Sequence, residues 1–372
     1  MDPQTVFCPN SACPARGQFG KGNIGVHSQK DRRYKCYECG KTFAETTGTP
    51  FYRLRTAKDL IVLVVTLLAY GCPLQAIVMA FGLDERTVQS WQARCGKHCQ
   101  DVHEHMVEQP RDLGQVQADE IRAKVQGGIL WMAMAIQVET RLWLGGVLST
   151  HRDTSLMLAL VAKVRACALC RPLLFCVDGC KSYIRAIQRV FREPIRTGRP
   201  GCPRLRPWDE VLIAQFVKHY ARKHVVAVTR RVVQGSRAQI KALLQKTQGG
   251  GVINTAYIER LNATFRSRIA ALVRRGRALA RQMPTLHNAM YLVGTVYNFC
   301  TYHDSLRVPL YLPHRKRRWL RRTPAIVAGI TDHLWTVEEL LSFRVPPPPW
   351  LPPKRRGRPS KAMKALMAQW CT

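Results

Sequence analysis

The order of apolar segments between residues 115 and 233 constrains the fold of this chain more than any other feature of its sequence. Extended segments over 115–125, 128–138 and 141–149 follow one another with short connections, which is the pattern of an antiparallel meander. Helix and strand then alternate, with helices expected over 154–166 and 182–191 and strands over 172–178 and 225–233. This order predicts an α/β domain with helices on the faces of the sheet and with the first and fourth strands as neighbours.

Net charge indicates the class of partner. The 372 residues include 58 Lys and Arg against 24 Asp and Glu, a formal charge of +34, which favours a polyanion. Nucleic acid is the first choice and an anionic membrane the alternative. The apolar run over 60–69 is shorter than the ~20 residues of a membrane-spanning helix, and the N-terminus lacks the pattern of a signal peptide. We therefore expect an intracellular protein that does not bind membranes.

Cysteine spacing near the N-terminus predicts a metal site. Cys8 and Cys13 form one pair, and Cys36 and Cys39 a second pair in the run Cys-Tyr-Glu-Cys-Gly-Lys-Thr-Phe. Two such pairs on turns can ligate Zn²⁺ tetrahedrally. The alternative is a set of buried thiols without metal. Because this segment has little apolar mass, we expect a zinc ribbon over residues 1–50 that needs the metal to fold.

Residues 51–110 have the pattern of a helix-turn-helix domain. Helices are expected over 57–70, 74–81 and 85–99, with Asp84 as the N-cap of the third. That helix would present Arg86, Gln89 and Arg94 to a DNA major groove. The alternative is a three-helix spacer without a role in recognition.

Three acids are expected to converge on the predicted sheet. Asp119 lies within the first strand, Asp178 ends the fourth, and Glu259 begins a long helix expected over 255–276. Carboxylates in this arrangement can hold two Mg²⁺ or Mn²⁺ ions about 3.5 to 4 Å apart, as in-line displacement at phosphorus requires. Asn262 and Arg266 share a helical face with Glu259, where Arg266 would reach a phosphate.

Each acid also has a structural alternative. Asp178 is well placed to cap the helix that follows it, and Glu259 to form a surface salt bridge with Arg260 or Arg266. Glu120 competes with Asp119, but strand alternation predicts that it points to the opposite face.

Several motifs resemble one family. The cysteine pairs, the helix-turn-helix, Ala118-Asp-Glu120, Val177-Asp-Gly179 with Tyr183, and the segment from Asn254 to Arg266 are similar to bacterial insertion-sequence transposases of the insertion-sequence-one type. The resemblance covers roughly residues 8–307. It implies an RNase H-like catalytic domain over 111–305, with Asp119, Asp178 and Glu259 as its metal-binding DDE triad and transposon ends as its substrate. Arg122 departs from the family, in which an aromatic residue is common at that position.

The basic, proline-rich tail over 306–372 contains one further motif. Arg356-Gly-Arg-Pro359 resembles an AT-hook, in which Arg356 and Arg358 would enter a narrow minor groove. A solvated charge run is the alternative.

Together these features predict a multidomain transposase that binds double-stranded DNA, element ends and target alike, and acts as a homo-oligomer in the bacterial cytoplasm, associated with the nucleoid. Two Mg²⁺ or Mn²⁺ ions and a structural Zn²⁺ are the expected cofactors. A DNA-binding regulatory or architectural protein with an inactive core is the alternative, and a nuclease that does not transpose is a third possibility.

Overall fold

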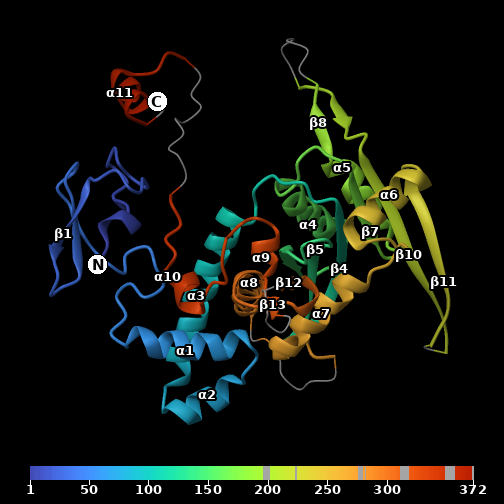
Figure 1. Cartoon of the computed structure of the whole chain (residues 1–372), viewed down its shortest axis with the longest axis horizontal. Helices are drawn as coiled ribbons and strands as arrows, with labels where there is room; N and C mark the ends of the chain where they lie inside the picture. The colour runs from blue at the N-terminus through green and yellow to red at the C-terminus, as the bar shows by residue number, and fades with distance from the viewer. Residues whose placement is uncertain are drawn as a thin grey trace. The chain divides into compact units, whose positions relative to one another are not determined.

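The computed structural model describes residues 1–195, 202–222, 224–274, 280, 282–310, 318–347 and 357–370. Its contacts divide the chain into two compact units (Figure 1). Met1–Lys58 and Ser342–Thr372 form the smaller unit, and Asp59–Leu341 forms the larger one. The two ends of the chain therefore share one unit, and the middle forms the other.

A six-stranded mixed sheet lies at the centre of the larger unit, in the order β11-β10-β7-β4-β5-β6. Its strands are β4 Gln115–Val125, β5 Gly128–Gln137, β6 Trp143–Ser149, β7 Leu173–Val177, β10 Val211–Ala221 and β11 His224–Gln234. β7 is parallel to its neighbours β4 and β10, and the other pairings are antiparallel. The α/β class is confirmed, and so is the expectation that the first and fourth predicted strands are neighbours.

The sequence reading missed β10, which lies beside β7 in the sheet. The strand predicted over 225–233 exists as β11, but it pairs with β10. In β10, Val211 to Gln215 are buried and His219 to Ala221 are exposed. Because half of the strand packs in the core and half projects into solvent, neither a buried run nor a regular alternation marks it.

Helices cover both faces of the sheet. They are α4 Thr154–Ala166, α5 Lys181–Val190, α6 Arg237–Gln248 and α7 Ala256–Arg268. Successive side chains of a strand point to opposite faces. On β4, Gln117 bonds to the Asn254 carbonyl oxygen just before α7, whereas Glu120 accepts from Tyr183 of α5. Thus α5 covers one face, and α7 the other.

A helical layer packs beside the sheet and consists of α1 Lys58–Ala69, α2 Leu74–Phe81, α3 Glu85–Met106 and α8 Met283–Phe299. Asp84 caps α3 as expected, because its side chain accepts from Thr87 N at 3.1 Å. Predicted to end near residue 99, α3 continues to Met106 because Val102 and His103 prolong its buried stripe. It lies close to α8 at Gly96, where a Cβ atom would be 2.5 Å from the Asn288 carbonyl oxygen.

Two further regions differ from the expected pattern. The helix predicted over 255–276 ends at Arg268, and a short 3-10 turn over Ala270–Leu272 follows it. α8 was not predicted, because every residue from Ala289 to Phe299 is buried and no polar face marks it as a helix.

The first part of the predicted tail belongs to the larger unit. It contains α9 Pro324–Val327 and α10 Val337–Ser342, the second close to the helix expected at 337–341. Trp335 packs against Phe299 with ring centroids 4.9 Å apart, and His98 Nε2 lies 3.2 Å from the Leu340 carbonyl oxygen. Residues up to Leu341 are therefore packed against α3 and α8.

The smaller unit is built on a three-stranded antiparallel sheet of β1 Ile24–Ser28, β2 Arg33–Cys36 and β3 Thr42–Ala44. A 3-10 turn, Pro3–Thr5, precedes the sheet, and α11 Lys361–Trp370 follows near the C-terminus. Residues after α10 return to this unit, where the Arg344 guanidinium donates to the carbonyl oxygens of Thr47 and Thr5, each at 3.3 Å.

Short elements complete the larger unit: β8 Arg192–Pro194, β9 Leu205–Pro207, β12 Val308–Leu310, β13 Arg318–Leu320 and a 3-10 turn over Asp304–Leu306. Among the residues that the structure describes, no helix combines the length and apolar character needed to cross a membrane.

Candidate functional site

Asp119 and Asp178 meet at the end of β7. The parallel register pairs Gln117 of β4 with Cys176 of β7, so two residues later Asp119 is level with Asp178. β7 stops at Val177, and the Asp178 carboxylate accepts from Cys180 N at 2.9 Å. The helix that follows is capped by Cys180, so Asp178 is not its N-cap.

Glu120 joins these two acids. One carboxylate oxygen of each of Asp119, Glu120 and Asp178 lies within 4.8 Å of the others, and we call these three residues the acidic cluster. Strand alternation correctly places Glu120 on the α5 face, yet its carboxylate still reaches the other two beyond the end of β7. Sequence reasoning set Glu120 aside in favour of Asp119, because alternation describes faces and not strand ends.

Burial and mutual repulsion raise the pKa of two of these acids. The buried carboxyl of Asp119, with Glu120, Asp178 and Glu259 nearby, has its pKa raised to about 7. Burial also raises the pKa of Glu120, although Arg152 opposes this shift. Glu120 accepts from Tyr183 Oη at 2.9 Å and pairs with Arg152, which also lies 3.5 Å from Asp178. Carboxylates packed this tightly are typical of a cation site.

The α7 residues predicted for the site face the same place. Asn262 Nδ2 donates to Asp119 Oδ2 at 2.8 Å. Asn262 is 1% exposed, and its Oδ1 has no hydrogen-bond partner within the described part of the chain. The same is true of Arg266 Nε, also among the described residues. Buried polar atoms normally have partners, and both of these residues line the cavity that contains Asp119.

Glu259 lies near the acidic cluster but has a different partner from either residue expected. Its Oε1 pairs with Lys218 Nζ at 2.6 Å and accepts from Thr255 Oγ1 at 2.7 Å. Burial alone would raise the pKa of Glu259, but these two contacts outweigh it and lower the pKa. Glu259 is therefore a charged carboxylate held at the start of α7.

These groups line one cavity of about 620 Å³, which we call the site cavity. Its acids are Asp119, Asp178 and Glu259, and its cations are Arg152, Lys218, Arg266 and Arg274. Four cations and three acids therefore line the same cavity. A concave site that contains both acids and cations suits a phosphate group accompanied by a divalent cation.

One wall of the site cavity was not predicted at all. Phe216, Val217, Lys218 and Tyr220 come from β10, the strand that the sequence reading missed. Arg152, which precedes α4, had no motif to mark it either. The cationic character of these positions was visible in the sequence, but only the fold brings them to the acids.

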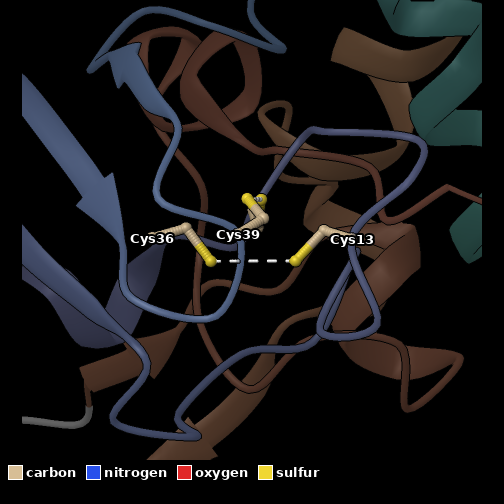
Figure 2. A group of neighbouring side chains, drawn as sticks. Cys13, Cys36 and Cys39 are labelled. Carbon is tan, nitrogen blue, oxygen red and sulfur yellow. Dashed lines mark hydrogen bonds between the residues drawn. The ribbon is translucent and has the colours of Figure 1, made fainter.

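The four predicted cysteines form a second candidate metal site, in the smaller unit. Cys8, Cys13, Cys36 and Cys39 each place a sulfur within 4.8 Å of the other three. Sγ atoms of Cys8 and Cys39 are 3.6 Å apart, and those of Cys13 and Cys36 are 3.8 Å apart. Figure 2 shows the sulfurs of Cys13, Cys36 and Cys39 directed toward one another. Ligands about 2.3 Å from a tetrahedral Zn²⁺ lie about 3.8 Å from one another, so the cluster could hold zinc.

Tight turns deliver the sulfurs. Gly17 and Gly40 both have left-handed φ values, +70° and +68°, and their N–H groups donate to the carbonyl oxygens of Cys8 and Cys36. Burial raises the pKa of Cys13 to about 11. For Cys39 burial is outweighed by the Lys41 N–H and other donors, which lower its pKa to about 6. Cys39 is thus more readily ionised for metal binding than Cys13.

The predicted DNA-reading residues of α3 lie near its start. Arg86 is exposed, whereas Gln89 and Arg94 are partly buried. Gln89 Nε2 donates to Glu85 at 2.6 Å. In the AT-hook-like motif Arg358 is exposed, and Arg356 lies outside the described residues.

No family model matches the chain, and no curated protein matches it. Among solved structures, it is similar to a chain of the cryo-electron-microscopy structure of a simian T-cell lymphotropic virus intasome in complex with the PP2A regulatory subunit B56 gamma. The match has 10% sequence identity and a TM-score of 0.27 and covers 80% of each chain. At that TM-score the similarity carries no argument about fold or function.

Proposed function

We propose that the protein is a transposase whose larger unit contains an RNase H-like domain that cleaves and rejoins DNA with the help of divalent cations. The observation that carries the proposal is the meeting of Asp119 and Asp178 on adjacent parallel strands, in a cavity shared with Glu259. Asp119 and Asp178 are far apart in sequence and have no structural need to meet, and Glu259 lines the same cavity. Their repulsion is offset when cations bind.

Asp119, Asp178 and Glu259 would hold Mg²⁺ or Mn²⁺ in this site. Divalent cations there would stabilise charge on the attacking and leaving oxygens of a phosphodiester. Asn262 orients Asp119 through its 2.8 Å hydrogen bond. Arg266 lines the same cavity, and its guanidinium would hold a phosphate oxygen.

The remaining parts would bind and position DNA. We assign the zinc ribbon, the start of α3 with Arg86, Gln89 and Arg94, and the AT-hook-like segment with Arg356 and Arg358 to recognition of the element's ends. A net charge of +34 supports a polyanionic partner for the whole chain. Joining two ends requires two active sites, so the proposed active form is a homo-oligomer on DNA.

Cleavage of DNA from the flanks of the gene tests the proposal. Labelled duplexes carrying those flanking sequences would be incubated with the full-length protein and Mg²⁺, and both nicked and joined products measured. We expect activity that disappears in Asp178→Asn and without divalent cation. Asp304→Asn, which alters an acid 78% exposed and outside the site cavity, should retain it.

The outcomes separate the alternatives. Equal activity in wild type and Asp178→Asn would refute the proposal. Binding without any cleavage would favour a regulatory or architectural protein, and cleavage without joining would favour a nuclease.

A further inference from the structure

The hairpin of β10 and β11 extends beyond the rest of the sheet (Figure 1). Its exposed residues include large apolar side chains: Tyr220 and Val226 are each 63% exposed, and Val225 is 49% exposed. Residues 211–234 contain five Lys or Arg and no Asp or Glu. The hairpin therefore exposes apolar and cationic side chains together. Such a surface indicates binding of a partner that has both negative charge and apolar groups.

One face of this hairpin is a wall of the site cavity. Phe216, Lys218 and Tyr220 alternate along β10, so they share a face, and all three line the cavity that contains Asp119 and Asp178. The ion pair between Lys218 and Glu259 of α7, at 2.6 Å, holds this face beside the acids.

Residues of β11 continue the same face. Arg230 lies opposite Phe216, Val228 opposite Lys218, and Val225 opposite Tyr220. The Arg230 guanidinium lies 5.4 Å from the centroid of the Phe216 ring, and Lys218 Nζ lies 5.6 Å from it. We call Phe216, Lys218, Tyr220, Val225, Val228 and Arg230 the hairpin face.

We propose that the hairpin face binds an unpaired base of the DNA strand that enters the site cavity, with the Tyr220 ring stacked on that base. The inference rests on the proposed function, because this strand is its substrate. Aromatic rings next to cations bind single-stranded nucleic acid by stacking on bases while the cations pair with phosphates. In an intact duplex the base faces are covered by their neighbours, so an exposed ring gains little from it.

Fluorescence of 2-aminopurine tests this contact. The probe is a duplex from the gene's flank with the base placed either in an unpaired overhang or inside the fully paired region. Binding is measured at equilibrium with Ca²⁺ in the Asp178→Asn background. Under these conditions the DNA stays intact, so the measurement does not depend on cleavage. We expect quenching of the overhang probe and a roughly 5- to 100-fold weaker affinity for it in Tyr220→Ala, the range of one lost stacking contact.

Matched variants separate stacking from other effects. Tyr220→Phe keeps the ring and should retain both quenching and affinity. Tyr302→Ala removes another exposed tyrosine, 41% exposed and outside the site cavity, and should also behave as the parent. Because Tyr220 is largely exposed, its replacement leaves the core intact, and thermal denaturation would verify this.

Equal quenching and affinity in Tyr220→Ala and its parent would overturn the inference. So would a loss of affinity in Tyr220→Ala that is the same for the overhang probe and the fully paired probe. Failure of the proposed function gives a different pattern. If the protein does not cleave DNA but quenching depends on Tyr220, the stacking contact stands and the transposase assignment is wrong. If wild type cleaves DNA and Tyr220→Ala has no effect on binding, the transposase assignment stands and the stacking contact is wrong.

Discussion

Replacing Arg152 with methionine removes the cation that neutralises a buried carboxylate of the acidic cluster. The Glu120 side chain is 1% exposed, whereas that of Arg152 is 43% exposed. Removing one partner of a fully buried ion pair costs about 3 to 5 kcal/mol, but solvent screens the half-exposed guanidinium. We therefore expect Arg152→Met to lower the free energy of unfolding by about 2 kcal/mol at neutral pH without divalent cations.

A double-mutant cycle isolates the interaction. Glu120→Gln removes the negative charge, and in its presence Arg152→Met should cost roughly 1 kcal/mol less than in the parent. Urea denaturation followed by tryptophan fluorescence gives the four free energies. If the site also binds Mg²⁺, saturating Mg²⁺ should stabilise Arg152→Met more than wild type, because the ion replaces the missing positive charge. A coupling energy near zero, with equal stabilisation of both proteins by Mg²⁺, would refute this reasoning.

Three further predictions concern other regions. Burial and Lys163 lower the pKa of His103 to about 3, whereas an unfolded histidine titrates near about 6.5. The contribution of His103 to stability should therefore fall by about 2 kcal/mol from pH 7 to 5, and urea denaturation should show the free energy of unfolding of wild type falling by that amount relative to His103→Asn. In Gly294→Ala the new Cβ would lie 2.2 Å from the Trp143 ring, so the free energy of unfolding should fall by about 1 to 3 kcal/mol. Gly128→Ala should not show this loss, because no atom lies within 4 Å of a Cβ at that position. Cys36→Ser should lose bound zinc by atomic absorption and expose residues 1–58 to protease, whereas Cys202→Ser, at an exposed cysteine, should not; zinc retained in both would contradict the site.

Much of the central sheet could be predicted because its residues obey simple periodicities. β4 has the predicted bounds, and α4 does too. These segments have one buried face or lie wholly in the core, and clear breaks separate them. β10 and α8 have no such signature, since β10 changes from core to solvent along its length and α8 is buried nearly all round.

The candidate site was predictable only as far as the predicted elements and their order determine it. Asn262 was placed beside the acids from helical spacing, and it does contact Asp119. Glu120, Arg152 and Lys218 come to the site because β7 ends early and because β10 lies beside it. Such convergence depends on where strands end in three dimensions, which local sequence does not encode.

Anomalous diffraction from a crystal soaked in Mn²⁺ would show whether the three acids hold metal ions. We expect manganese peaks in contact with the carboxylates of Asp119 and Asp178, with Glu259 completing the site and two ions about 3.5 to 4 Å apart when DNA is bound. Peaks confined to other parts of the molecule, or none near these acids at saturating Mn²⁺, would contradict it.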